Sequence, residues 1–141
     1  MRNLVTIQTI DWIKPIKDAD QIELCGILGW QCVIAKKDNF KIGDKVLYVE
    51  IDSVLPEKPE FEFLRSRNFR VRTIKLKGEV SQGLVLPLKA LMGGYVNPKN
   101  IEVGRDVTDL IGVTKYLSPS EKEEFLRSET KLKNEKTLLL S

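Results

Sequence analysis

Short stretches of alternating or β-branched residues constrain the fold of this chain more than any other feature. They are bounded by turn residues such as Pro15, Gly29 and Pro56, and they lie at 5–13, 22–28, 30–35, 45–51, 69–77 and 84–86. Strands this short and this closely spaced, with at most short helices between them, predict an all-β fold. We expect a five-stranded OB-type closed barrel with short helices, and an SH3-like barrel is the rival architecture.

Positive charge is concentrated in one part of the chain. Six cations stand between residues 65 and 78, with no acid before Glu79: Arg65, Arg67, Arg70, Arg72, Lys75 and Lys77. The whole chain has 23 Lys and Arg against 20 Asp and Glu, a net charge of +3, so without these six the balance is 17 against 20. Local positive charge of this kind is typical of an anion-binding surface. A solvated edge strand, whose charges discourage aggregation, is the simpler interpretation.

The apolar residues of the same stretch change phase. Phe69 and Val71 alternate with arginines, and after Thr73 the alternation shifts by one residue to Ile74 and Leu76. A shift by one residue moves side chains to the opposite face of a strand. We therefore expect a bulge or bend near Thr73 that keeps the apolar side chains inside.

The absence of histidine narrows the possible chemistry. The chain has no histidine, which removes Ser–His and Cys–His nucleophile pairs and nearly all catalytic zinc sites. The acids that could cluster are Asp44, Glu50 and Asp52, and nothing at metal-ligand spacing accompanies them. We therefore expect neither a metal site nor an independent hydrolase.

The two cysteines and the first residues of the chain indicate in which cellular compartment the protein is found. If Leu28 and Gly29 form a two-residue hairpin turn, Cys25 and Cys32 lie directly opposite each other, and we expect two free thiols rather than a disulfide. No apolar run approaches the ~20 residues of a membrane span. The first residues lack the hydrophobic core of a signal peptide. We expect a cytoplasmic protein with no membrane partner.

Residues 117–141 differ in composition from residues 1–116 and form a charged helical tail or linker in our expectation. Ser118 to Glu121 has the pattern of a capping box with proline at the first helical position. Glu123–Arg127 and Glu129–Lys133 have the spacing of stabilising ion pairs on a helix. The tail is expected to be a solvated helix, or one that docks on a partner or a second copy.

Several ordered blocks of sequence resemble a known module. They are Pro15-Ile16, Ala19 to Leu24, Gly29-Trp30, Phe40 to Asp44, Glu50 to Pro56, Phe61 to Arg65 and Ser81 to Pro87. Together, over roughly residues 5–116, these blocks resemble the N-terminal OB-fold module of ATP-dependent RNA ligases of the Deinococcus type. The block from Ala19 to Leu24 is also similar to tRNA-binding OB domains.

The resemblance implies a role without catalysis. In the resembling ligases the module precedes a nucleotidyltransferase domain with a Lys-x-Asp-Gly motif, and it helps to engage nicked duplex and the RNA 3′-OH end. ATP and Mg²⁺ would belong to that catalytic domain, so no cofactor and no enzyme activity are expected of this chain on its own. Lys36-Lys37-Asp38-Asn39 lacks the glycine of the motif and is interpreted as a loop.

The expected partner is RNA or an RNA-containing nicked duplex, with a nucleotidyltransferase domain or a partner protein beside it. The six cations would contact phosphates, giving salt-dependent and sequence-tolerant affinity, and Lys36, Lys37 and Lys41 would extend the patch. Trp30 at a hairpin tip could stack on a base, although packing in the core is its other interpretation. Ser81 and Gln82 could add polar contacts or close a turn. A freestanding protein-interaction module or a tRNA-binding OB module are the alternative functions.

Overall fold

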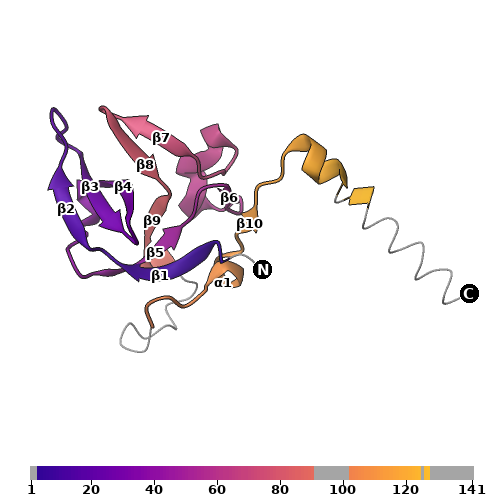
Figure 1. The fold of residues 1–141 in the computed structure, drawn as a ribbon, viewed down its shortest axis with the longest axis horizontal. Coiled ribbons are helices and arrows are strands. Elements are labelled where there is room, and N and C mark those ends of the chain that lie inside the picture. The colour runs from indigo at the N-terminus through magenta and orange to yellow at the C-terminus, as the bar shows by residue number, and fades with distance from the viewer. Residues whose placement is uncertain (1–2, 91–101, 125, 128–141) are drawn as a thin grey trace, which may run out of the picture.

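A computed structural model describes residues 3–90, 102–124 and 126–127, and Figure 1 shows their arrangement. The strands are β1 (Val5–Thr9), β2 (Trp12–Pro15), β3 (Ile22–Ile27), β4 (Trp30–Ala35), β5 (Lys45–Val49), β6 (Ser53–Val54), β7 (Thr73–Leu76), β8 (Glu79–Gln82), β9 (Leu84–Pro87) and β10 (Thr114–Lys115). The helices are η1 (Lys36–Asp38), η2 (Pro59–Arg67), η3 (Leu88–Ala90) and α1 (Thr108–Ile111). The expected all-β class is confirmed, with more and shorter strands than the sequence pattern predicts.

Two three-stranded antiparallel sheets share one bent segment of chain. The first sheet has the order β1-β5-β9 and the second the order β2-β3-β4. Only Ile10 and Asp11 separate β1 from β2, and their amides donate to the carbonyls of Asp44 and Gly26 at 3.1 and 2.8 Å. The segment from β1 to β2 therefore crosses from one sheet to the other without losing its backbone hydrogen bonds.

A second junction brings β4 beside β8. The Val33 amide donates to Oγ of Ser81 at 2.9 Å, and Nε2 of Gln31 donates to the Val80 carbonyl at 2.9 Å. The chain then passes through Gly83 into β9. Among the described residues, these side-chain hydrogen bonds join β4 to β8, and a backbone ladder between the two strands, which would close a barrel, is not formed. The closed five-stranded barrel therefore stays a prediction.

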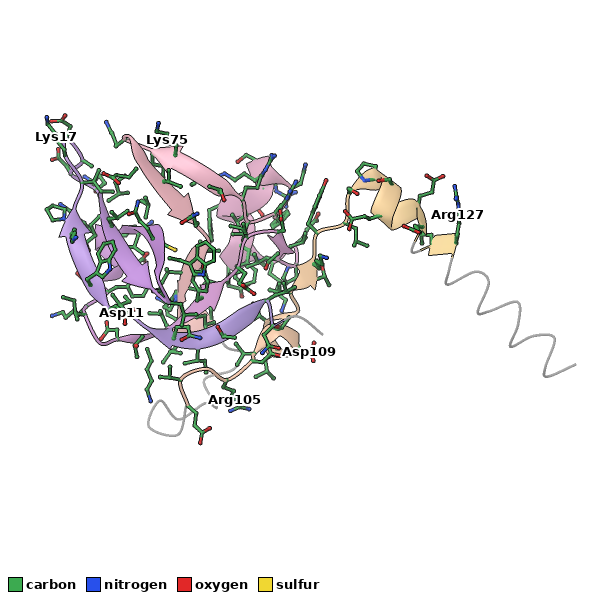
Figure 2. The ribbon with its side chains drawn as sticks, in the orientation of Figure 1. Asp11, Lys17, Lys75, Arg105, Asp109 and Arg127 are labelled. Carbon is green, nitrogen blue, oxygen red and sulfur yellow. The ribbon has the colours of Figure 1, made fainter. Side chains whose placement is uncertain are left out.

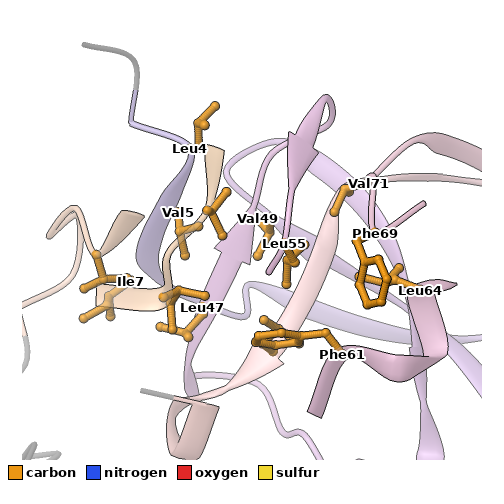
Figure 3. Packing of buried hydrophobic residues seen from close by; sticks show 14 residues of the cluster. Leu4, Val5, Ile7, Leu47, Val49, Leu55, Phe61, Leu64, Phe69 and Val71 are labelled. Carbon is orange, nitrogen blue, oxygen red and sulfur yellow. The ribbon is translucent and has the colours of Figure 1, made fainter. Parts of the chain in front are cut away.

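The interior holds two groups of buried apolar side chains. The larger group lies between β1, β5, η2 and α1 and includes the residues labelled in Figure 3: Leu4, Val5, Ile7, Leu47, Val49, Leu55, Phe61, Leu64, Phe69 and Val71. The smaller group is enclosed by β3, β4 and β5 and includes Ile27, Ile34 and Tyr48. The sequence predicts a helical turn at 61–65 that plugs one end of the fold. The structure confirms the helical turn, which lies within η2 with Phe61 and Leu64 buried; that it plugs the end of a barrel stays a prediction.

The hairpin between β3 and β4 follows the sequence prediction. Leu28 and Gly29 both have positive φ angles, 54° and 79°, as a two-residue turn of type I′ requires. The resulting register pairs Cys25 with Cys32. Both cysteines are buried free thiols, as expected.

The basic stretch is not one strand, and this corrects the sequence interpretation. Arg65 and Arg67 lie on η2, and the chain reverses at Asn68 and Phe69, which have φ angles of 54° and 60°. A sharp bend therefore falls at the first of the alternating residues. Near Thr73 the chain also changes partner: the Val71 amide donates to the Ser53 carbonyl at 2.8 Å, whereas Thr73 begins the pairing with β8, and Arg72 and Thr73 are both exposed. Leu76 is 36% exposed, because among the described strands β7 pairs with β8 alone, outside both buried groups.

The segment after β10 begins the expected helix. Residues 119–124 and 126–127 are helical and lead away from the strands (Figure 1). Oγ of Ser118 accepts a hydrogen bond from the Glu121 amide at 3.3 Å, and Glu123 pairs with Arg127 at 3.0 Å. The Glu129–Lys133 pair lies outside the described residues. Among those that are described, no helix has the length and apolar character to cross a membrane.

Candidate nucleic-acid interface

The chain between β5 and β8 makes a long excursion that carries all six cations of the basic stretch. It contains β6, η2 and β7, and it returns to β8 through the turn at Lys77 and Gly78. Burial of Phe61, Leu64, Phe69 and Val71 fixes this excursion to the body of the protein. Its cations therefore stand on a rigid support, although they do not share a single strand.

A groove of about 230 Å³ lies between η2, the β7–β8 hairpin and the side of β4 that carries Val33 and Ala35. Apolar side chains form most of its lining, and among the described residues the charged ones that line it are Arg67 and Arg72. We call it the arginine groove. An apolar surface bordered by two cations suits a ligand that is both anionic and partly apolar.

Arg67 and Arg72 differ from their neighbours in having no internal partner. Both are exposed, and within the described part of the chain neither side chain makes an ion pair or a hydrogen bond. The donors of each guanidinium group are therefore free to bind phosphate oxygens in the two-pronged geometry that arginine favours.

Arg65 is also exposed but has a local partner. Its guanidinium donates two hydrogen bonds to the Glu62 carboxylate, the second of them 3.0 Å from Nη2 to Oε2. These bonds hold the pKa of Glu62 below its usual value and raise the pKa of Arg65. Ion pairs this exposed are weak, so phosphate can compete for Arg65.

Arg70 is committed to an internal contact. Nη2 lies 2.7 Å from Oδ1 of Asp52, and the guanidinium lies 3.6 Å from the centre of the Tyr116 ring. Arg70 does not line the arginine groove. The structure therefore separates it from Arg67 and Arg72, with which the sequence groups it.

The candidate lysines lie on several different elements. Lys75 lies on β7 and Lys77 on the following turn, both exposed. In Figure 2, Lys75 and Lys17, which lies on the loop between β2 and β3, project from the same end of the molecule. Lys36 and Lys37 are exposed on η1, and Lys37 lines a second, larger groove of about 600 Å³. Lys41 is exposed nearby in sequence.

Trp30 occupies the hairpin tip, as predicted, and is 41% exposed. Its interpretation as a core residue is wrong, because it is the first residue of β4, next to the turn. The residue is therefore accessible to a ligand from solvent.

Ser81 uses its side chain inside the fold, and Gln82 uses its main-chain carbonyl. Ser81 is buried, and its hydroxyl accepts the hydrogen bond from the Val33 amide. The main-chain carbonyl of Gln82 accepts hydrogen bonds from the Tyr48 hydroxyl at 2.6 Å and from Cys32 Sγ at 3.4 Å, and the residue is half-buried. Burial raises the pKa of Tyr48, so this phenol remains a donor. These bonds hold the junction between β8, β4 and β5.

Sequence reasoning missed Phe63, whose side chain is 58% exposed and lines both grooves. The spacing of its neighbours holds the necessary information. Phe61 and Leu64 are three residues apart and share the buried face of η2, so a helix here must turn Phe63 outward.

Two of the acidic residues that the sequence suggests could cluster, Asp44 and Asp52, have different partners. Asp44 accepts a hydrogen bond from the Lys41 amide at 2.9 Å, and Asp52 pairs with Arg70. Across residues 3–90, 102–124 and 126–127, no group of three His, Cys, Asp or Glu side chains is placed to hold a metal ion.

Comparison with known proteins defines the class. A family model of an OB-fold domain matches residues 4–88, and the chain belongs to this family. The RNA ligase of Naegleria gruberi, in a structure with PPi, is 39% identical with a TM-score of 0.71. That match covers 84% of this chain and 36% of the ligase. A mutant of the same ligase with AMP and Mn gives 38% identity and a TM-score of 0.69 over the same shares.

A curated relative is more distant. The phenylalanine–tRNA ligase beta subunit of Geobacter metallireducens is 28% identical over 118 residues, which are 77% of this chain and 14% of the subunit. The chain thus resembles one part of an RNA ligase and a small part of a tRNA ligase subunit. The likeness to RNA ligases confirms the coarser part of the sequence resemblance.

Proposed function

We propose that this chain is the RNA-binding OB-fold module of an RNA ligase of the Deinococcus type. In this role it helps to engage nicked duplex and the RNA 3′-OH end, and it contributes no catalytic residue. The arginine groove is the observation that carries the proposal, because its apolar lining and its two free guanidinium groups match the chemistry of a nucleotide strand.

The position of the groove supports this function. With β1 and β2 counted as the first strand of an OB fold, β3 and β4 are the second and third, and β8 with β9 is the fifth. The basic excursion is then the loop between the fourth and fifth strands. OB folds bind oligonucleotides on the face of the second and third strands, between this loop and the one that follows the first strand. The arginine groove lies on β4 beside the excursion.

The relatives point to RNA in two ways. The names of the solved ligase and of the curated subunit both refer to ligases whose stated substrate is RNA or tRNA. The chain spans 36% of the RNA ligase, so ATP, Mg²⁺ and the sealing chemistry would come from a nucleotidyltransferase domain or a partner protein. A tRNA-binding module is the second candidate, which the similarity to the tRNA ligase subunit favours.

The test is binding of a labelled nicked duplex with an RNA 3′-OH strand at about 50 and 200 mM salt. We would compare the wild-type chain with Arg67→Ala/Arg72→Ala. The control is Arg105→Ala/Arg127→Ala, which removes the same charge from exposed positions away from the groove (Figure 2). Arg70 is unsuitable for this test because its loss would also disturb the Asp52 contact.

The expected result is weaker binding by the groove variant. The slope of log affinity against log salt should fall by about one for each phosphate that the variant no longer binds. The control should bind like the wild type. Equal binding by the groove variant and the control, or no binding at low salt, would refute the proposal. Preferential binding of tRNA over the nicked duplex would favour the second candidate.

A further inference from the structure

We infer that Phe63 is a stacking surface for one unpaired nucleobase, with the neighbouring phosphates held by Arg67 and Arg72. This inference rests on the proposed function and adds which part of the RNA is recognised. It assigns a binding role to Phe63, which is not one of the cations of the basic stretch.

The phenyl ring is presented on a rigid support. Phe63 is 58% exposed, while Phe61 and Leu64 on the same helix are buried in the larger apolar group. The buried pair fixes η2 against the body, so the Phe63 ring is held outward at a defined place. The ring also continues the apolar lining of both grooves, and contiguous exposed apolar surface marks binding sites.

The ring stands at the border of two grooves. The arginine groove and the larger groove have part of their lining in common, including Phe63, Val33, Ala35 and Leu84. Val33 and Ala35 alternate along β4 with the buried Cys32 and Ile34, and so form an apolar floor beside the ring. A flat base could lie on the ring with its edge over this floor.

The charged residues that line the two grooves determine on which side of the Phe63 ring the phosphates lie. Arg67 and Arg72 are the charged residues that line the arginine groove over the described part of the chain. The larger groove has Asp38 and Glu60 as well as Lys37 and Lys89. The phosphates of an RNA strand are therefore favoured in the arginine groove. Arg67 lines this groove and follows Phe63 by four residues on η2.

The chemistry selects an unpaired base. Each face of a base within a continuous duplex is already covered by its neighbours, whereas an unpaired base has a free face for an aromatic side chain. The arginine groove, at about 230 Å³, has room for one flat base and not for a run of stacked bases. One nucleotide, not a longer bundle of bases, is the fitting occupant.

The experiment measures binding of two RNA probes by fluorescence. One carries 2-aminopurine in a single-stranded overhang at the RNA 3′ end, and the other carries it in the middle of a continuous duplex. The variants are Phe63→Leu, which keeps an apolar side chain but removes the aromatic face, and Phe63→Trp, which restores one. Ile42→Ala is the control, because Ile42 is an exposed apolar residue that lines neither groove.

We expect 2-aminopurine fluorescence to be quenched on binding of the overhang probe to the wild type and to Phe63→Trp. Phe63→Leu should bind the overhang probe about 5- to 150-fold more weakly, as expected for the loss of one base–aromatic stack. Its salt dependence should be unchanged, since no charge is removed. The continuous duplex should bind all four proteins with similar affinity.

The outcomes separate this inference from the proposed function. If Phe63→Leu binds the overhang probe as well as the wild type, while Arg67→Ala/Arg72→Ala loses affinity, the stacking role is wrong and RNA binding stands. Equal weakening of both probes by Phe63→Leu would also overturn it. If the wild type binds neither probe, the proposed function itself fails. Unfolding curves of each variant establish that the protein is folded.

Discussion

The Nη2 atom of Arg70 lies 2.7 Å from Oδ1 of Asp52, and this pair fixes the path by which the chain leaves the OB fold. The Asp52 amide donates to the Val71 carbonyl at 2.7 Å, and the Asp52 carbonyl accepts from the Tyr116 amide at 2.7 Å. The Arg70 guanidinium then stacks on the Tyr116 ring. Asp52 therefore binds the basic excursion to the strand that precedes the tail.

The first prediction concerns this contact. Arg70→Ala should lower the free energy of unfolding by about 1–2 kcal/mol, because it removes a partly exposed ion pair and a cation–π contact. The side chains of Arg70 and Asp52 are 24% and 45% exposed, which limits the effect. Urea denaturation measures it.

A double-mutant cycle checks the assignment to this pair. Asp52→Asn is the matched partner, because asparagine tolerates the positive φ of 64° at this position. We expect a coupling energy of about 0.5–1 kcal/mol between Arg70→Ala and Asp52→Asn. A coupling near zero would contradict the contact.

The second prediction concerns Thr108, which fastens α1 to the first strand. Its hydroxyl accepts hydrogen bonds from the amides of Leu4 and Val5, both at 3.0 Å, and donates to Asp106. Thr108→Val should lower the free energy of unfolding by about 2–4 kcal/mol, since it leaves two buried amides without acceptors. Thr108→Ser should retain most of the stability in the same thermal or urea measurement. Similar losses in both variants would show that the hydroxyl is not the cause.

The third prediction is a pH dependence at Asp106. Hydrogen bonds from the Thr108 hydroxyl and amide hold the pKa of this carboxyl below its usual value. A carboxyl whose pKa is lowered by folding stabilises the protein above its unfolded pKa of about 3.9, and this contribution disappears as the pH falls through the folded value. The stability difference between the wild type and Asp106→Asn should therefore be present at pH 6 and shrink below about pH 4. A difference that stays constant with pH would contradict the prediction.

The fourth prediction concerns the two thiols. Burial raises the pKa of Cys25 and of Cys32 to about 12. Since the thiolate is the reactive form, and neither residue is exposed, labelling with a thiol reagent at pH 8 should be very slow in the folded protein and complete in denaturant. Rapid labelling of the folded chain would show that the β3–β4 hairpin opens.

The fifth prediction concerns Gly83, where β8 passes into β9. Its φ is 116°, and a Cβ atom here would lie 2.7 Å from Cε2 of Tyr48 and 2.8 Å from the Val49 carbonyl oxygen. Gly83→Ala should cost about 3 kcal/mol or more, from strain and overlap combined. Gly29→Ala is the control, because it has positive φ but open space around it, and should cost only about 1–2 kcal/mol. Equal costs would argue against the close approach of Tyr48.

Features that depend on neighbouring residues were predictable from the sequence. Turn chemistry at Leu28 and Gly29 set the register that places Cys25 opposite Cys32, and the capping pattern set the helix start at Ser118. The ordered blocks also indicated the OB-fold class, which the family match to residues 4–88 confirms. The turn and the helix start each depend on a few adjacent residues, whereas the fold class was indicated by the order of blocks along residues 5–116.

Contacts between distant residues decided the rest. Arg67, Arg70 and Arg72 are equivalent as a sequence pattern, and only the tertiary structure places Asp52 and Tyr116 against Arg70 while leaving the other two exposed. It likewise left Leu76 outside the core. The sequence by itself determined the β-rich class, the turn at Leu28 and Gly29 and the local excess of charge. Which cations remain free to bind a ligand depends on partners far away in the chain, because burial and ion pairing arise only when the fold brings them together.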